Sequence, residues 1–211
     1  MIVGGDIGEP ATATEIVKTA VEAFGRIDVL VSNAGICPFH AFLSMPYNLW
    51  HKVQQVNLNG AFYIVQAVAN QMQTQTPQGG SIVAISSISA LVGGEFQSHY
   101  TPTKAGLVSL MQSCAIALGK YGIRCNTVLP GTIETPINED DLSDVEKRRY
   151  MEGRTCLGRL GQPEDLGGPG NYDSKKVLTL SGVFGERRVE WICHRGVAPC
   201  RRRYLTSQFI V

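Results

Sequence analysis

The chain has 211 residues, enough for one sizeable domain and too few for two comfortable ones. Hydrophobic residues make up 44% and charged residues 18%, a composition that excludes a disordered chain. The 19 basic side chains nearly balance the 18 acidic ones, so net charge gives no reason to expect a nucleic acid or an acidic membrane surface as partner.

The sequence also lacks the usual signs of a membrane, secreted or metal-binding protein. Its apolar runs are far shorter than the roughly 18 residues of a membrane span, and its first residues do not resemble a signal peptide. The six cysteines form no C-x-x-C pair, which favours reduced thiols and a cytoplasmic location. His40, His51, His99 and His194 have no metal-ligand spacing, so we expect no metal site and place them in loops or on the surface.

Helical and strand-like segments alternate along the chain. An amphipathic helix is predicted over 9–25, and an apolar strand over 27–31 follows it. Further helices are predicted over 48–75 and 98–121, and further strands over 81–86 and 124–129. This order predicts an α/β fold with a doubly wound, Rossmann-like parallel sheet that is covered on both faces. The reactive groups of such sheets lie at the carboxyl ends of the strands.

Small and polar residues follow each predicted strand, at 32–35, 86–89 and 130–136. Tyr100 and Lys104 lie between the last two segments, four residues apart on one face of a helix. An ammonium beside a phenol favours the phenolate and lowers the pKa of the tyrosine, which would make Tyr100 a general acid or base.

Five short motifs occur in a characteristic order: N-A-G at 33–35, V-N-L at 56–58, S-S at 86–87, Y-x-x-x-K at 100–104 and P-G-x-I-x-T at 130–135. In order and spacing they resemble the short-chain dehydrogenase/reductase family, whose members move hydride between NAD(P) and alcohols or carbonyls. The resemblance covers residues 1 to about 169.

The resemblance implies a role for each matching residue. Tyr100 would exchange a proton with the substrate oxygen, Ser87 would hydrogen-bond that oxygen, Lys104 would lower the pKa of Tyr100, and Asn57 would support a proton-relay water. NADP or NAD would be held by Asp6, Ile7, Asn33, Ala34, Gly35, Tyr100, Lys104, Pro130, Gly131, Ile133 and Thr135. The segment 137–160 would be a lid, and the two long helices would pair copies of the chain into dimers or tetramers.

Three functions remain open at this point. The segment 133–160 most resembles fungal-type sugar dehydrogenases, such as an L-rhamnose or other aldose 1-dehydrogenase, which predicts a small sugar or alcohol as substrate. A 3-oxoacyl reductase is the alternative within the family. The third possibility is a catalytically inactive fragment.

The inactive fragment is considered because the resemblance fails at both ends. The glycine-rich T-G-x-x-x-G-x-G turn, which receives the pyrophosphate, has no counterpart. The residue that selects NAD or NADP is missing with it. We therefore expect an incomplete sheet that lacks the family's first βαβ part and its last strand. Residues 1–169 would form a partial oxidoreductase domain, and 170–211 an aberrant, arginine-rich tail.

The genetic code suggests an origin for this tail. Codons for 191–194 can be chosen that read Gly-Tyr-Val-Thr one base later, and the same shift permits Val-Asp-Gly-Gly near Arg203 and Phe-Leu-Ala-Ser-Asp over 183–187. These pieces match the family's usual ending. Our hypothesis is that residues from about 170 to 181 translate an insertion or retained intron fragment, and that 182–211 are out of frame. The arginines would then follow from the shift and would not indicate nucleic-acid binding.

Overall fold

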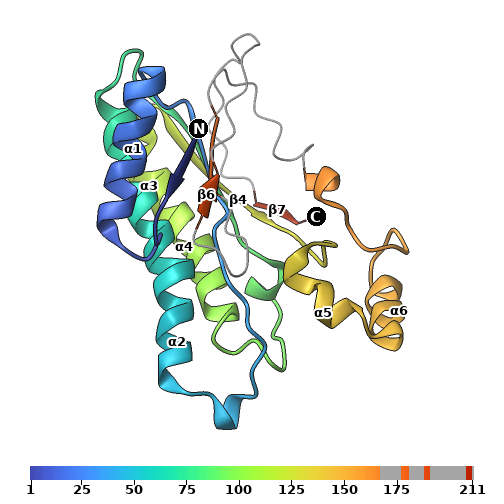
Figure 1. Cartoon of the computed structure of the whole chain (residues 1–211). Coiled ribbons are helices and arrows are strands. Elements are labelled where there is room, and N and C mark those ends of the chain that lie inside the picture. Colours follow the sequence, from blue (N-terminus) through green and yellow to red (C-terminus); the bar gives the residue numbers. More distant parts are fainter. Residues whose placement is uncertain (167–176, 181–187, 191–207, 211) are drawn as a thin grey trace.

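A computed structural model describes residues 1–166, 177–180, 188–190 and 208–210 of the chain (Figure 1). Its helices are Pro10–Phe24 (α1), Tyr47–Gln54 (α2), Gly60–Thr74 (α3), Thr101–Leu118 (α4), Glu139–Leu142 (α5) and Val145–Gly153 (α6). Its strands are Ile2–Gly4 (β1), Val29–Ser32 (β2), Gly80–Ile85 (β3), Ile123–Leu129 (β4), Val177–Leu180 (β5), Arg188–Glu190 (β6) and Gln208–Ile210 (β7). In the described part of the chain, no helix is long and apolar enough to cross a membrane.

A parallel sheet with the strand order β5-β2-β3-β4-β7 forms the centre of the molecule. Leu30 pairs with Ile82 and Ile82 with Cys125, so the three middle strands lie in register and end together. The predicted α/β class with a parallel sheet is therefore confirmed. The three segments predicted to carry chemistry follow β2, β3 and β4, so all three lie at the carboxyl ends of the parallel strands.

The three long helices α1, α3 and α4 pack side by side along the sheet (Figure 1). α1 begins with Pro10 and ends at Gly25, whose φ of 78° suits a left-handed cap that other residues adopt at a cost. Ile16, Ile64 and Met72 are fully buried between these helices and the sheet. We expected helices on both faces; within the described residues, the long helices cover one face.

The predicted helix over 48–75 is interrupted. α2 and α3 are joined by a single π-helical turn at Gln55–Asn59, and this turn contains Asn57. A π turn inserts one extra residue, which changes the direction in which the side chains before and after it point. The periodicity of the sequence shows a continuous helix because one extra residue hardly disturbs an apolar pattern of this length.

The two edges of the sheet are occupied by short strands from the C-terminal segment. β5 pairs in parallel with β2, and β7 with β4, whereas β1 pairs with β6 in a separate two-stranded sheet. Our expectation of an incomplete sheet is modified accordingly, since 177–180 and 208–210 supply strands at both edges. An open sheet edge presents unpaired N–H and C=O groups, with which an extended segment can pair. Trp191, His194 and most of the arginine-rich tail lie outside the described residues.

Candidate active site

Tyr100 and Lys104 lie at the first turn of α4, beside the loop that follows β3. The Lys104 Nζ is 5.5 Å from the centroid of the Tyr100 ring, so the two side chains share one face as predicted. The side chain of Tyr100 is hydrogen-bonded to that of Ser87, thirteen residues earlier, and the Ser87 Oγ also accepts a bond from the backbone N–H of Ser89 at 3.1 Å. The hydroxyls of Ser87 and Tyr100 are thus brought together from separate elements.

The pKa of Tyr100 does not shift as the sequence predicts. Burial is the largest influence and raises the pKa of Tyr100 well above its ordinary value, the nearby Cys37 raises it further, and the bond to Ser87 opposes both. Loss of solvation disfavours the phenolate. The expectation that Lys104 lowers this pKa is therefore wrong for this structure, and Tyr100 is protonated at neutral pH.

Lys104 is buried, with 4% of its surface exposed. Its ammonium donates to the carbonyl oxygen of Ile85 at 2.8 Å, and burial lowers the pKa of Lys104 to about 8. Gly35 packs closely against both side chains, because a Cβ on Gly35 would lie 3.5 Å from the Lys104 Nζ and 3.4 Å from the Asn57 Oδ1. The backbone of the N-A-G segment therefore passes directly over Lys104 and Asn57.

Asn57 is fully buried on the π turn and joins three segments. Its Oδ1 accepts from the N–H of Ile36 at 2.8 Å, and its Nδ2 donates to the carbonyl of Ile36 at 2.9 Å and to the Oγ1 of Thr103 at 3.2 Å. Thr103 in turn donates to the carbonyl of Tyr100 at 2.6 Å. Asn57 therefore fixes the loop after β2 against the helix that carries Tyr100.

His99 is a buried residue next to the candidate site, where it was not predicted from the sequence. It was expected in a loop or on the surface, yet it is 0% exposed and its Nε2 lies 2.6 Å from the carbonyl oxygen of Pro38. The expectation was wrong because the spacing of histidines predicts metal ligands and says nothing about burial at the start of α4. Its position immediately before Tyr100 was the available signal.

Asp6 and Ile7, predicted to contact the adenine end of a cofactor, lie in the turn after β1. The Asp6 carboxylate accepts from the N–H of Gly8 at 3.0 Å and from the Lys52 Nζ at 3.2 Å. The side chain of Ile7 belongs to the core and packs against Gly60, where an added Cβ would lie 2.9 Å from the Ile7 carbonyl oxygen. The structure thus places Ile7 at the start of α3 and joins Asp6 to α2 through Lys52.

The predicted 130–135 segment crosses the ends of β3 and β4. The Pro130 carbonyl accepts from the N–H of Ile88 at 2.8 Å, which joins the loops after these two strands. Ile133 forms a bridge with Gly161, and its carbonyl accepts from the Asn138 Nδ2 at 2.6 Å and the Thr135 Oγ1 at 3.4 Å. Gly131 and Asn33 are exposed, whereas Ala34 and Thr135 are half-buried.

The N–H donors of Lys104 could bind the ribose hydroxyls of a dinucleotide. An ammonium has three N–H donors, and Lys104 directs one of them at a protein acceptor, Ile85. Among the described residues, the other two donors have no hydrogen-bond acceptor, and Gly35 lies beside them without a side chain of its own. These residues fit the ribose end of such a cofactor. In the described ranges, no group of three or more His, Cys, Asp and Glu side chains is arranged to hold a metal ion.

The same arrangement of elements occurs in known proteins. A family model described as enoyl-(acyl carrier protein) reductase matches residues 1–170. The L-rhamnose 1-dehydrogenase (NAD(P)(+)) of Sphingomonas sp. is 68% identical over 167 residues, which are 79% of this chain and 65% of that protein. The L-rhamnose-1-dehydrogenase of Scheffersomyces stipitis is 60% identical over 193 residues, covering 87% of this chain and 74% of that protein.

A solved structure agrees with these relatives. The gluconate 5-dehydrogenase from Burkholderia cenocepacia, in complex with NADP and tartrate, is 28% identical with a TM-score of 0.74, covering 84% of this chain and 72% of that one. The chain spans about 65% of the length of the first curated relatives that it matches. With these matches and the arrangement of Asn57, Ser87, Tyr100 and Lys104, the chain belongs to the short-chain dehydrogenase/reductase family.

Proposed function

We propose that the protein is an NAD(P)-dependent dehydrogenase that oxidises a sugar hydroxyl to a carbonyl, with L-rhamnose or a closely related aldose as substrate. The observation that carries the reaction type is the contact of Tyr100 with both Ser87 and Lys104. The names of the relatives support the substrate, since two of them are L-rhamnose 1-dehydrogenases at 60% and 68% identity.

In this proposal, Tyr100 takes the proton of the reacting hydroxyl group, and Ser87 holds the same oxygen by a hydrogen bond. Lys104 binds ribose hydroxyls with its two remaining donors, and Asn57 keeps the loop over 33–36 in place. Bound NAD(P) supplies the hydride acceptor. For the cofactor we also propose contacts from Asp6, Ile7, Asn33, Ala34, Gly35, Pro130, Gly131, Ile133 and Thr135.

The raised pKa of Tyr100 has a consequence for the reaction direction. Oxidation requires the phenolate as base, and because burial raises the pKa of Tyr100, the phenolate is a minor species at neutral pH. Its fraction grows about tenfold per pH unit below the pKa. The oxidation rate should therefore rise with pH through the neutral and mildly alkaline range, and the reverse carbonyl reduction should not.

The test is to incubate the purified 211-residue chain with L-rhamnose and NADP⁺ or NAD⁺ and follow the absorbance of the reduced nicotinamide. A parallel assay with a 3-oxoacyl thioester and NADPH tests the reductase alternative. We expect sugar oxidation with a rate that rises with pH. Saturable NADPH binding by fluorescence titration would support the cofactor site separately, and its absence would favour an inactive fragment.

We further propose that residues 1–169 form the oxidoreductase part and that 170–211 are an aberrant tail, in which about 170 to 181 translate an insertion and 182–211 are out of frame. Sequencing the transcript tests this division, because a message whose shifted frame lacks codons for the family's ending would exclude it. Association of copies through α3 and α4 into a dimer or tetramer is the expected assembly. The exposed Phe62 on α3 and Ile116 on α4 support it, and sedimentation would measure it.

A further inference from the structure

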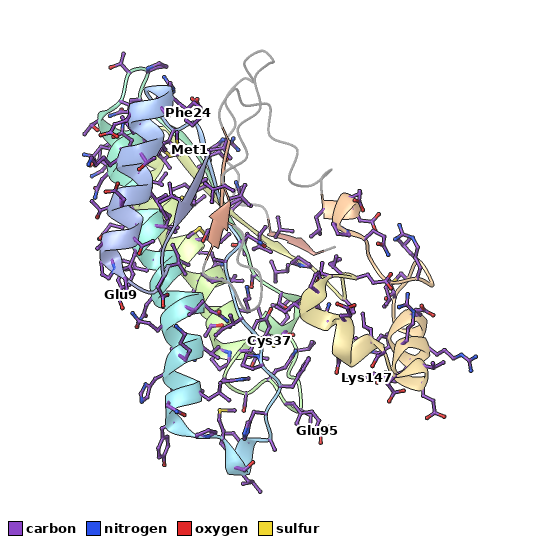
Figure 2. The ribbon with its side chains drawn as sticks, in the orientation of Figure 1. Met1, Glu9, Phe24, Cys37, Glu95 and Lys147 are labelled. Carbon is purple, nitrogen blue, oxygen red and sulfur yellow. The ribbon has the colours of Figure 1, made fainter. Side chains whose placement is uncertain are left out.

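The loop after β2 is held by two buried side chains, one at each end of a three-residue stretch. Asn57 binds both backbone groups of Ile36, and His99 binds the carbonyl of Pro38. Cys37 lies between them and is itself 7% exposed. Figure 2 shows Cys37 near the middle of the molecule, between the helices that pack on the sheet and the lobe that carries Lys147.

His99 contributes the shorter of these bonds. Its Nε2 is 2.6 Å from the Pro38 oxygen, and because a carbonyl oxygen can only accept, Nε2 carries the proton. Its Nδ1 is buried without a partner among the described residues, so the ring is held by this single side-chain bond and by packing. The backbone carbonyl of His99 accepts from the Gln54 Nε2 at 3.0 Å, which anchors the residue to α2.

The next residue along the chain is Tyr100. A movement of His99 therefore moves Tyr100, and a movement of the Pro38 loop changes the wall beside the Tyr100 hydroxyl, where Cys37 contributes to its electrostatic surroundings. Asn57 reaches Tyr100 by a second route, through Thr103. The two routes join the same loop to the same turn of α4.

We propose that His99 is a positioning residue, which holds Cys37 and Pro38 at a fixed distance from Tyr100 through the bond from Nε2 to the Pro38 carbonyl. It touches neither the reacting atoms nor a cofactor in this proposal. The effect of His99 on turnover rests on the proposed function, whereas the effect of His99 on the position of the loop does not.

The experiment uses the thiol of Cys37 as a reporter of loop opening. Burial raises the pKa of Cys37 to about 11, so the closed loop protects it from alkylation, and the rate of labelling reports local opening. The variants are His99→Leu, which removes the donor, His99→Asn, which is too short to reach Pro38, and His99→Gln, which keeps an N–H near the position of Nε2. His51→Leu, at an exposed histidine of α2, is the matched control.

The purified full-length variants are treated with iodoacetamide, and labelling is followed by mass spectrometry of the peptide that contains Cys37. We expect His99→Leu and His99→Asn to label about tenfold faster than the parent, because one buried hydrogen bond is lost. His99→Gln should restore a rate within about threefold of the parent, and His51→Leu should match it. Cys125, buried in β4, should label equally slowly in every variant.

Two results would overturn the proposal. One is a parent-like rate at Cys37 in both His99→Leu and His99→Asn. The other is a parallel rise at Cys125, which would mean that His99 stabilises the whole domain and does not hold one loop in particular. If His99→Leu does not fold, the comparison of His99→Asn with His99→Gln still decides between these outcomes.

Turnover provides the second measurement. With active parent enzyme, His99→Asn should lower kcat more than it raises KM, and His99→Gln should recover kcat. A parent without turnover would contradict the proposed function and leave the labelling result intact, so failures of the two proposals are distinguishable.

Discussion

Two regions of the molecule are held together by different kinds of interaction. The buried brace, which consists of Asn57, His99 and Lys104, makes hydrogen bonds to backbone atoms of the strand-end loops, and its side chains are at most 4% exposed. The expected lid, residues 137–160 with its flanks over 134–165, carries several ion pairs among partly exposed side chains.

The lid ion pairs share acidic and basic partners. Glu134 binds Arg148 and accepts from Gln162, and Arg148 also binds Glu152 at 3.1 Å. These bonds lower the pKa of Glu134, with the hydrogen bond from Arg148 as the largest cause. Arg159 pairs with Asp165 in the same way and holds the pKa of that carboxyl well below its usual range.

The different interactions in the two regions indicate which region is more easily displaced. Breaking a buried hydrogen bond leaves unpaired polar groups at a large desolvation cost, whereas exposed ion pairs contribute little and weaken with salt. The brace therefore keeps Tyr100, Lys104 and the N-A-G loop in one geometry, and we expect the ion-paired segment to be displaced more easily. The following predictions test this contrast, from the largest expected effect to the smallest.

Replacing Tyr100 by Phe should remove the proton acceptor and reduce kcat by about a thousandfold. The brace does not use the Tyr100 hydroxyl, so the thermal unfolding midpoint should change little. Steady-state assays and circular dichroism of the same preparation measure both quantities. A Tyr100→Phe variant that retains most of its activity would exclude Tyr100 as the acid or base.

Asn57→Leu keeps the side-chain volume and leaves both backbone groups of Ile36 without their partners. The free energy of unfolding should fall by about 3 kcal/mol, the cost of leaving buried polar groups unpaired. Urea denaturation measures it. Asn59→Leu is the control, because Asn59 lies on the same π turn and, among the described residues, its side chain bonds to the Gln55 side chain alone. Equal losses in the two variants would show that the brace is no more important than the turn itself.

The effect of Lys104→Met on the stability of the folded protein should depend on pH. Burial lowers the pKa of Lys104 from 10.5 to about 8, so the charged form destabilises the folded protein at neutral pH, and this penalty is relieved as pH rises from about 8 to 10.5. Relative to Lys104→Met, the parent should therefore gain stability over that window, and the buried Cys37 and Cys125 thiols, whose pKa values are raised in both proteins, cancel in the comparison.

Thermal unfolding at several pH values provides the measurement for Lys104. Lys120→Met, at an exposed lysine that lies 5.0 Å from the centroid of the Tyr121 ring, is the control and should show no such window. A parent whose stability falls relative to that of Lys104→Met between pH 8 and 10 would contradict the direction of the shift. The variant should also lose NADPH affinity, since Met offers no donor to ribose hydroxyls.

Arg148→Gln should have the smallest effect on stability, and this effect should be limited to the lid. Removing the bonds to Glu134 and Glu152 loosens α6 without changing the midpoint of global unfolding. Proteolysis within the lid should become faster. In the parent the rate of this proteolysis should increase with salt concentration, and in Arg148→Gln it should not. Arg149→Gln alters the neighbouring exposed arginine and serves as control. A fall in the unfolding midpoint for Arg148→Gln would mean that the lid is part of the core.

The order of helices and strands followed from the sequence because apolar periodicity and buried β-branched runs are local properties. β2, β3, β4, α1 and α4 lie within a few residues of their predicted bounds. The pairing of Tyr100 with Lys104 followed for the same reason, since a four-residue separation on a helix determines a shared face. Ser87 and Asn57 needed the family resemblance, because nothing local connects them with Tyr100.

Other features depended on contacts between distant segments, which no local pattern contains. The tertiary structure decided that His99 is buried against Pro38, sixty-one residues away, and that the helix around Asn57 contains a π turn. It also decided the sign of the pKa shift of Tyr100. Residue spacing brings the Lys104 ammonium close, whereas packing determines how much water reaches the phenol, and here the loss of water has the larger effect.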